Sequence, residues 1–273
     1  MNELLESVLE QIRPVVVGCE ESLELMLIAL ACRGHVLLEG VPGVAKTLLA
    51  RALAATLGVR VRRVQFTPDM LPSDLTGTMT LRGGELAFRP GPVFTNVLLA
   101  DEINRTPPKT QAALLEAMQE GQVTIDGQAH PLGDPFLVLA TQNPIEYEGT
   151  YPLPEAQLDR FLLKVTVGYP SAAHERELLG LEREGLEPLG LGRIRPVAGP
   201  AEIQGAVEEA RTTAVAGEVL DYVVDLARRT RELPSVALGA SPRAAVHLLA
   251  AAKAAARLRG RDFVTPDDAR ALA

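Results

Sequence analysis

The sequence predicts an α/β fold, in which a mainly parallel β-sheet is covered by helices on both faces and is followed by a small all-helical domain. Three observations carry this prediction. Short apolar runs of strand length alternate with helical patterns between residues 35 and 167, which is typical of parallel sheets. Two glycine-centred patterns interrupt this alternation as β-hairpins would. After residue 171 the strand-like runs stop and helical patterns follow.

The elements of the first part follow from local patterns. Residues 2–13 place Leu4, Leu5, Val8 and Leu9 at helical spacing and end before Pro14, so a helix is expected there. A second helix is expected over residues 20–33, and a buried strand over 35–39 leads through a glycine-rich turn into a helix that reaches residue 57. The other expected strands cover residues 61–66, 97–100, 136–140 and 162–167, with helices between most of them.

Two hairpins are expected within the α/β core. Residues 78–89 have Gly83-Gly84 at their centre, and residues 123–132 have Asp126-Gly127. Both dipeptides favour tight hairpin turns. Ordinary surface loops are the weaker alternative, because the flanking residues alternate between apolar and polar side chains.

The C-terminal part is expected to be helical. A helix near residues 172–184 leads into a connector rich in glycine and proline over 185–200, and helical patterns follow at 218–231 and 242–259. Thr265-Pro-Asp-Asp268 is typical of a helix start, and the chain ends five residues later, which indicates truncation within the last element. We therefore expect a core domain over residues 1–170 and a connector with a helical domain over 171–273.

Composition and charge limit the classes of partner. The 4% aromatic content and the absence of tryptophan argue against a stacking platform for single-stranded nucleic acid. The net charge of −8 leaves a local basic patch as the alternative by which a phosphate backbone could bind. The densest basic run, Arg60, Arg62 and Arg63, alternates with valines and is predicted to be a solvated strand face. Cys19 and Cys32 are expected to be buried reduced thiols. The acidic N-terminus and the lack of a long apolar stretch favour a soluble cytoplasmic protein with no membrane span.

A phosphate-binding loop is predicted between the first strand and the helix after it. The segment reads Gly40-Val-Pro-Gly43-Val-Ala45-Lys46-Thr47. Glycines in such a loop allow several backbone N–H groups to face one anion. The Lys46 ammonium is expected to bind the β- and γ-phosphates, and the Thr47 hydroxyl to ligate magnesium. Ala45 stands where the pattern has its last glycine, so a slightly different loop is expected there.

Two further strands end in polar side chains that suit the same site. Residues 97–100 lead into Asp101 and Glu102 at the end where ligands bind in this type of sheet. Asp101 is expected to hold magnesium, and Glu102 to orient and deprotonate the attacking water; an acidic turn is the alternative. Residues 136–142 lead into Asn143, whose amide is expected to contact the γ-phosphate or the attacking water, with a plain turn as the alternative.

These segments together resemble the AAA+ ATPases, and among them the MoxR family. The likeness rests on Glu39-Gly-Val-Pro-Gly-Val-Ala-Lys-Thr47, including the alanine, and on Ala100-Asp-Glu-Ile-Asn-Arg-Thr-Pro-Pro-Lys-Thr-Gln111. It continues in Ala140-Thr-Gln-Asn-Pro144 and Leu153-Pro-Glu-Ala-Gln-Leu-Asp-Arg-Phe161, and covers nearly the whole chain. The implied fold is a P-loop parallel-sheet AAA+ core with inserted β-hairpins, followed by a small helical lid domain.

The resemblance implies a role for each matching residue. Lys46 and Thr47 would be Walker A residues, Asp101 and Glu102 Walker B residues, and Asn143 sensor 1. Arg160 would be an arginine finger donated to a neighbouring subunit, with an ion pair to Asp159 or Glu155 as the alternative, and Arg243 resembles sensor 2. The implied ATP contacts are Val17, Gly18, Gly40, Val41, Pro42, Gly43, Val44, Ala45, Lys46, Thr47 and Leu48, with magnesium on Thr47 and Asp101.

The resemblance also implies how such a protein works. It would be a homo-oligomer, a hexameric ring, that hydrolyses ATP and remodels or activates partner proteins, among them proteins with von Willebrand factor A domains. The hairpins would line a pore or contact the partner. The alternative, a AAA+ motor on nucleic acid, predicts basic hairpins, yet residues 123–132 contain no lysine or arginine and the other hairpin has only Arg82 and Arg89. A nucleotide switch without turnover predicts loss of Glu102, Asn143 or Arg160, and all three are present.

Overall fold

The computed structural model describes residues 1–41, 43–83, 85–143, 149–181, 183–184 and 187–273. A five-stranded parallel sheet forms its centre, with the strand order β2-β5-β8-β1-β9. The strands are β1 (Val36–Glu39), β2 (Val61–Gln65), β5 (Val97–Asp101), β8 (Leu137–Gln142) and β9 (Leu163–Thr166). The predicted strands are confirmed to within two residues at each end.

Helices cover both faces of this sheet, which confirms the predicted fold class. Those before and within the sheet region are α1 (Asn2–Ile12), α2 (Glu20–Ala31), α3 (Lys46–Thr56), α4 (Pro72–Thr76), η1 (Ile103–Arg105), α5 (Pro108–Glu120) and α6 (Glu155–Leu158). No described helix is long and apolar enough to cross a membrane.

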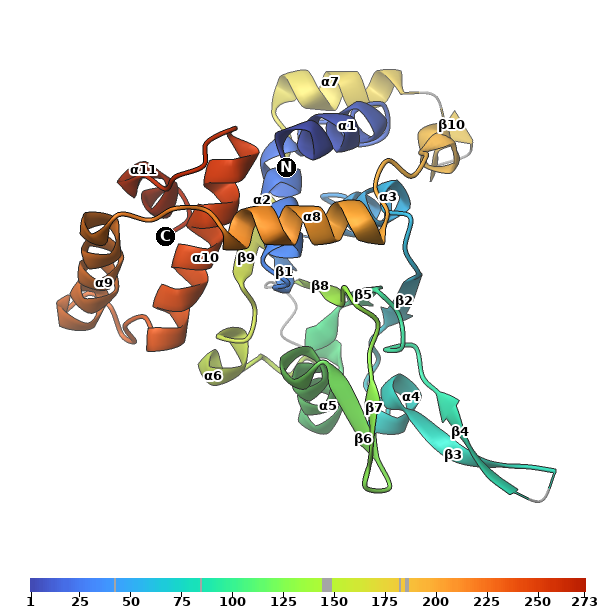
Figure 1. The fold of residues 1–273 in the computed structure, drawn as a ribbon. Helices are drawn as coiled ribbons and strands as arrows, with labels where there is room; N and C mark the ends of the chain where they lie inside the picture. The colour runs from blue at the N-terminus through green and yellow to red at the C-terminus, as the bar shows by residue number, and fades with distance from the viewer. Residues whose placement is uncertain (42, 84, 144–148, 182, 185–186) are drawn as a thin grey trace.

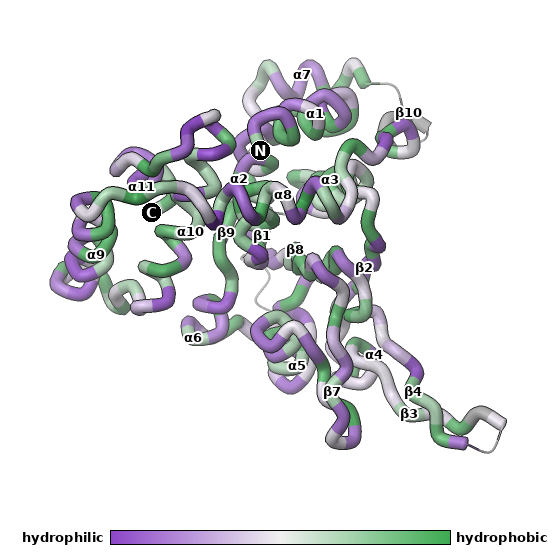
Figure 2. The backbone as a smooth tube through the Cα atoms, in the orientation of Figure 1, coloured by the Kyte–Doolittle hydropathy of each residue, from purple (hydrophilic) through white to green (hydrophobic). Residues whose placement is uncertain are grey.

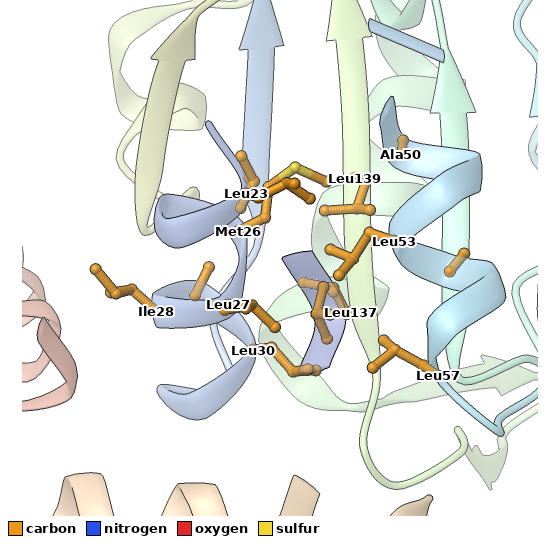
Figure 3. Packing of buried hydrophobic residues seen from close by; sticks show 14 of the residues in the cluster. Leu23, Met26, Leu27, Ile28, Leu30, Ala50, Leu53, Leu57, Leu137 and Leu139 are labelled. Carbon is orange, nitrogen blue, oxygen red and sulfur yellow. The ribbon is translucent and has the colours of Figure 1, made fainter. Parts of the chain in front are cut away.

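The side-chain alternation of the strands explains why both faces are covered. In β8, Leu137 and Leu139 pack with α1, α2 and α3, whereas Val138 and Ala140 pack on the other face with residues of α5. Figure 3 shows the two leucines between side chains of α2 and side chains of α3. A strand buried on both faces needs apolar residues at every position, which is the pattern that predicted a parallel sheet.

The segment after the sheet is helical, with differences from the prediction. It contains α7 (Ala172–Gly180), β10 (Arg183–Glu184), β11 (Glu187–Pro188), η2 (Leu189–Arg193), α8 (Pro200–Arg211), α9 (Gly217–Glu232), α10 (Pro242–Leu258) and α11 (Pro266–Arg270). Helix α7 ends at Gly180, four residues earlier than expected, since glycine is a poor helix former. A two-residue strand pair spans the start of the expected connector, with β10 just before it and β11 within it. Its last residue, Pro200, is the first residue of α8, a helix that the sequence analysis did not predict.

Helix α10 joins the helical region to the core. Ala251, Ala254 and Ala255 belong to the apolar cluster beneath α1, α2 and α3, whereas Ala252 and Ala256 pack in a separate cluster with Val219 and Val223 of α9. The small side chains allow close packing on both sides. Figure 2 shows hydrophobic and hydrophilic residues alternating along α1 and α9, as expected for helices with one buried face. The division at residue 170 stays a prediction.

Both predicted hairpins are present and extend from the same end of the molecule (Figure 1). They pair β3 (Gly77–Arg82) with β4 (Glu85–Pro90), and β6 (Gln122–Ile125) with β7 (Gln128–Pro131). Asp126 and Gly127 have φ angles of 48° and 79°, which suits a two-residue turn with both residues left-handed. The hairpins touch where the rings of Phe88 and His130 stack with centroids 4.2 Å apart.

Candidate active site

A cavity of about 810 Å³ lies at the carboxyl ends of the parallel strands. The last residues of β5, β8 and β9 line it, together with the N-terminal half of α3 and the segment between α1 and α2. Parallel sheets bind ligands at this edge because the loops that leave the strands converge there. The volume is in the range of small-molecule sites.

The predicted phosphate loop opens helix α3. Ala45 has φ 57° and ψ 22°, so it adopts the left-handed conformation that a glycine would have at this position. The loop therefore keeps this bend with alanine, at a cost of roughly 1 kcal/mol relative to glycine. The expectation of a slightly different loop at Ala45 stays a prediction. Gly43, Val44, Ala45, Lys46, Thr47 and Leu48 all line the cavity.

Lys46 is held against the start of the same loop. Its ammonium donates to the carbonyl oxygens of Gly40 and Val41, the latter at 3.0 Å. Gly40 lies against the carbonyl oxygen of Val167, so a side chain could not fit at this position. Gly40 and Val41, which were predicted ATP contacts, do not line the cavity. Pro42 lies outside the described residues.

Asp101 is the most buried acid of the site, with 3% of its surface exposed. Its Oδ1 accepts hydrogen bonds from the hydroxyls of Thr47 at 2.9 Å and Thr141 at 3.3 Å. Its Oδ2 accepts from the Arg63 guanidinium at 2.6 Å. The carboxylate is thus oriented from three sides. The predicted proximity of Thr47 and Asp101 is confirmed.

Glu102 follows directly and has a left-handed backbone, with φ 57° and ψ 50°. Its N–H donates to the Thr141 hydroxyl at 3.0 Å. Its carboxylate accepts from the Gln65 amide at 2.6 Å and pairs with Arg105 at 2.9 Å. Because of this left-handed backbone at Glu102, the carboxylates of Asp101 and Glu102 contact different partners. Both side chains line the cavity.

The remaining predicted contacts lie on two sides of the cavity. Asn143 lines it at the end of β8, and its carbonyl oxygen accepts from Asn104 at 3.3 Å. Val17 and Gly18 also line it, together with Tyr169. Gly18 has φ 71° and packs against the ring of His174, so α7 closes this side of the cavity.

Comparison with known proteins agrees with this geometry. A sequence profile described as "ATPase family associated with various cellular activities (AAA)" matches residues 35–163, and one described as "AAA lid domain" matches residues 228–273. The chain is 46% identical to Chaperone MoxR1 of Mycobacterium tuberculosis, over 97% of this chain and 72% of that protein. The chain belongs to the MoxR family of AAA+ ATPases.

Another protein and a solved structure are similar to almost all of this MoxR-family chain. It is 49% identical to the uncharacterized protein YeaC of Bacillus subtilis, over 100% of this chain and 85% of that protein. The crystal structure of a presumed ATPase from Cytophaga hutchinsonii matches with a TM-score of 0.88 and 40% identity, over 99% of this chain and 84% of that one. Membership of the AAA+ ATPases implies nucleotide binding.

The cavity of this AAA+ chain fits a nucleotide with magnesium. Magnesium prefers oxygen ligands and usually takes only one or two from the protein, the rest coming from phosphates and water. The Thr47 hydroxyl and the Asp101 carboxylate are such ligands and already contact each other. In the described part of the chain no group of three His, Cys, Asp or Glu side chains is placed to hold a metal.

Arg160 and Arg243 are not brought to the cavity. Neither belongs to its lining, and Arg243 is exposed at the start of α10. The two lie in one region, because the Ser241 hydroxyl donates to Asp159 at 2.8 Å. In the described part of the chain Arg160 has no ion pair with Asp159 or Glu155, which was the alternative to a finger.

Three residues at the cavity were missed by sequence reasoning. Arg63 and Gln65 of β2 contact Asp101 and Glu102, and Thr141 of β8 contacts both acids. Arg60, Arg62 and Arg63 are all exposed, as predicted for a solvated face, and Arg63 additionally contacts Asp101, which was not predicted. The two-residue spacing of Arg63 and Gln65 places them on one strand face and was available in the sequence. No pattern in the neighbouring sequence indicates that this face of β2 contacts Asp101 and Glu102.

Proposed function

We propose that this protein hydrolyses ATP with magnesium in the 810 Å³ cavity, and that a hexameric ring of subunits uses this reaction to remodel or activate partner proteins. The convergence of Lys46, Thr47, Asp101 and Glu102 at one sheet edge is the observation that carries the proposal. These residues come from the phosphate loop and from β5, and supply a cation, a hydroxyl and two carboxylates.

The phosphate loop binds the nucleotide. The first N–H groups of α3 and the Lys46 ammonium face the phosphates and balance their negative charge. Thr47 and Asp101 would hold magnesium, which would stabilise the charge that develops on the phosphate oxygens. Val17, Gly18 and the neighbouring residues of α7 enclose the adenine base of the nucleotide.

Glu102 activates the attacking water. Its carboxylate accepts the proton of that water while Asn143 orients the water or the γ-phosphate. Gln65 and Arg105 hold the Glu102 carboxylate, so one of these contacts has to loosen before Glu102 acts as a base.

Arg160 and Arg243 act on the nucleotide of a neighbouring subunit. Their location away from the cavity of their own chain supports this arrangement. A permanently charged, planar guanidinium matches the oxygens of a transferring phosphoryl group. Such a finger contributes about 10³–10⁵ in rate. The site is therefore complete only in a ring.

The partner is a protein. The relative from Mycobacterium tuberculosis is named a chaperone, and we extend that role to this chain. The hairpins β3–β4 and β6–β7 are the surfaces that contact the partner, and proteins with von Willebrand factor A domains are the first candidates. A cytoplasmic location stays a prediction.

Two substitutions test the proposed reaction. Lys46→Ala is expected to remove most ATP binding, because it takes away the cation that faces the phosphates. Glu102→Gln is expected to keep binding and to lose about 10²–10⁴ in hydrolysis rate, because the amide keeps the shape but not the basicity. Binding of a fluorescent ATP analogue and phosphate release separate the two effects.

Glu116→Gln is the matched control, since Glu116 is an exposed carboxylate of α5 outside the cavity. It is expected to hydrolyse ATP like the parent. Hydrolysis by Glu102→Gln at the parent rate would contradict the assignment of the base.

A further inference from the structure

We propose that Arg63 sets the magnesium affinity of the site: its charge balances Asp101, so the protein binds magnesium weakly until phosphates add negative charge. This inference deepens the proposed function and rests on it. Arg63 acts through the charge of Asp101, because it contacts that carboxylate and no reacting atom.

The position of Arg63 follows from strand alternation. Strand β2 is an edge strand beside β5, and Arg63 and Gln65 point to the same side and line the cavity. Arg62 and Val64 point to the other side, where Val64 is buried. Val64 pairs in register with Ala100, the residue before Asp101. Strand β2 thus places the Arg63 guanidinium beside Asp101, the last residue of β5.

The contact between Arg63 and Asp101 joins an accessible cation to a buried anion. The side chain of Arg63 is 52% exposed, whereas that of Asp101 is 4% exposed, and the two atoms are 2.6 Å apart. A carboxylate with so little access to water depends on its partners for stabilisation. The hydroxyls of Thr47 and Thr141 stabilise the Asp101 carboxylate only through their dipoles, whereas Arg63 stabilises it with a full positive charge.

The same charge opposes magnesium. Arg63 already binds Oδ2 of Asp101, and Thr47 and Thr141 bind its Oδ1. The positive charge of Arg63 therefore balances the Asp101 carboxylate and weakens its attraction for a dication. In water, a unit charge about 6 Å from a dication changes the binding constant of the dication about tenfold by Coulomb's law. Nucleotide phosphates bring several negative charges and reverse this balance. The site therefore takes up metal together with nucleotide.

The opposite role for Arg63 makes the opposite prediction. If the guanidinium only held Asp101 in the orientation that magnesium needs, its loss would weaken metal binding. The sign of the change in metal affinity without nucleotide therefore decides between the two roles.

The test measures binding of manganese(II) alone, as a stand-in for magnesium, by the loss of its free electron paramagnetic resonance signal, with magnesium as competitor. Arg63→Gln is expected to bind the metal about tenfold more tightly than the parent at low salt, and by a smaller factor at high salt, because salt screens the exposed charge. Arg63→Lys keeps the charge and is expected to stay close to the parent. Arg62→Gln, on the other side of the same strand, is the matched control and is expected to leave the affinity unchanged.

Equal or weaker metal binding by Arg63→Gln would overturn the inference, as would equal tightening by Arg62→Gln. Circular dichroism checks that each variant is folded, which is expected because both arginines are exposed. The measurement uses no ATP, so it is independent of turnover. A parent protein that fails to hydrolyse ATP would contradict the proposed function while leaving the metal result standing.

Discussion

His35 is a buried histidine that ties three elements together. It precedes β1, its Nδ1 accepts the N–H of Val138 at 3.0 Å in β8, and its Nε2 donates to the carbonyl oxygen of Met118 at 3.1 Å in α5. Because Nδ1 accepts, the ring is neutral with its proton on Nε2. Burial lowers the pKa of His35 from 6.5 to about 4.

This histidine makes the stability of the protein depend on pH. Below pH 6.5 the unfolded chain binds a proton at His35 that the folded protein does not bind, so the free energy of unfolding falls as the pH drops from 6.5 towards 4. The slope from this group is up to about 1.4 kcal/mol per pH unit. We expect urea unfolding between pH 7.5 and 4.5 to show this loss, and His35→Gln to have a flatter profile, since an amide does not titrate.

His174→Gln is the control for this experiment, because His174 lies against Gly18 and does not contact His35 or its partners Met118 and Val138. It is expected to keep the slope of the parent. A His35→Gln variant with an undiminished slope would show that other groups cause the pH dependence. His35→Gln is also expected to be less stable than the parent at pH 7.5, because the amide cannot reproduce both hydrogen bonds of the ring.

The hairpin β6–β7 connects the site with the surface of the molecule. It begins after Gly121, the residue that follows α5, and the chain then runs into β8, which contains Thr141 and is followed by Asn143. We therefore expect a change at the γ-phosphate to shift this hairpin through one strand. The stack of Phe88 on His130 is expected to carry such a shift to β3–β4.

We expect replacement of residues 122–131 by a short Gly-Ser turn to leave at least part of the ATPase activity and to abolish remodelling of the partner. The hairpin has no lysine or arginine for phosphates, and its residues do not line the cavity. Because the replacement removes His130, amide hydrogen exchange in β3–β4 is expected to rise. ATPase, partner and exchange measurements on one variant test this.

Thr124→Ala is the control for the hairpin, because it changes an exposed residue of β6 and keeps the stack. Normal remodelling by the shortened protein would refute a role in partner contact. Parallel loss of assembly and hydrolysis, seen by sedimentation, would instead assign the hairpin to the subunit interface.

At the scale of the whole molecule, the proposed function predicts that a second subunit completes the site. The cavity contains Lys46 and Glu102 of its own chain, whereas Arg160 lies elsewhere. Mixing Arg160→Ala with Glu102→Gln, each inactive alone, is expected to restore part of the ATPase activity. In randomly mixed rings, roughly a quarter of the head-to-tail interfaces pair an intact site with an intact finger.

Mixing Lys46→Ala with Glu102→Gln is the matched control. Both changes damage the same cavity, so no interface in a mixed ring has an intact site and no activity is expected to return. If mixed rings form with Arg160→Ala and the activity stays at the sum of the separate samples, Arg160 does not act in trans.

The sequence by itself determined the five strands, the two hairpins, the phosphate loop and the Thr47–Asp101 pair. These features depend on residues that are neighbours in the chain, such as alternating apolar side chains, Asp126-Gly127 at a turn, or a glycine-rich loop between a strand and a helix. The carboxyl ends of parallel strands meet at one edge, so even the meeting of Thr47 with Asp101 follows from the fold class.

Only the tertiary structure decided which residues surround the two acids and how the helical region meets the core. Arg63 reaches Asp101 because β2 pairs with β5 in one register, and a shift by one residue would present Arg62 instead. Helix α10 divides its alanines between two clusters, which its own pattern does not reveal. Arg160 and Arg243 lie near each other and away from the cavity because Ser241 binds Asp159 across 82 residues of chain. Contacts of this kind depend on the packing of distant segments, and no local pattern encodes them.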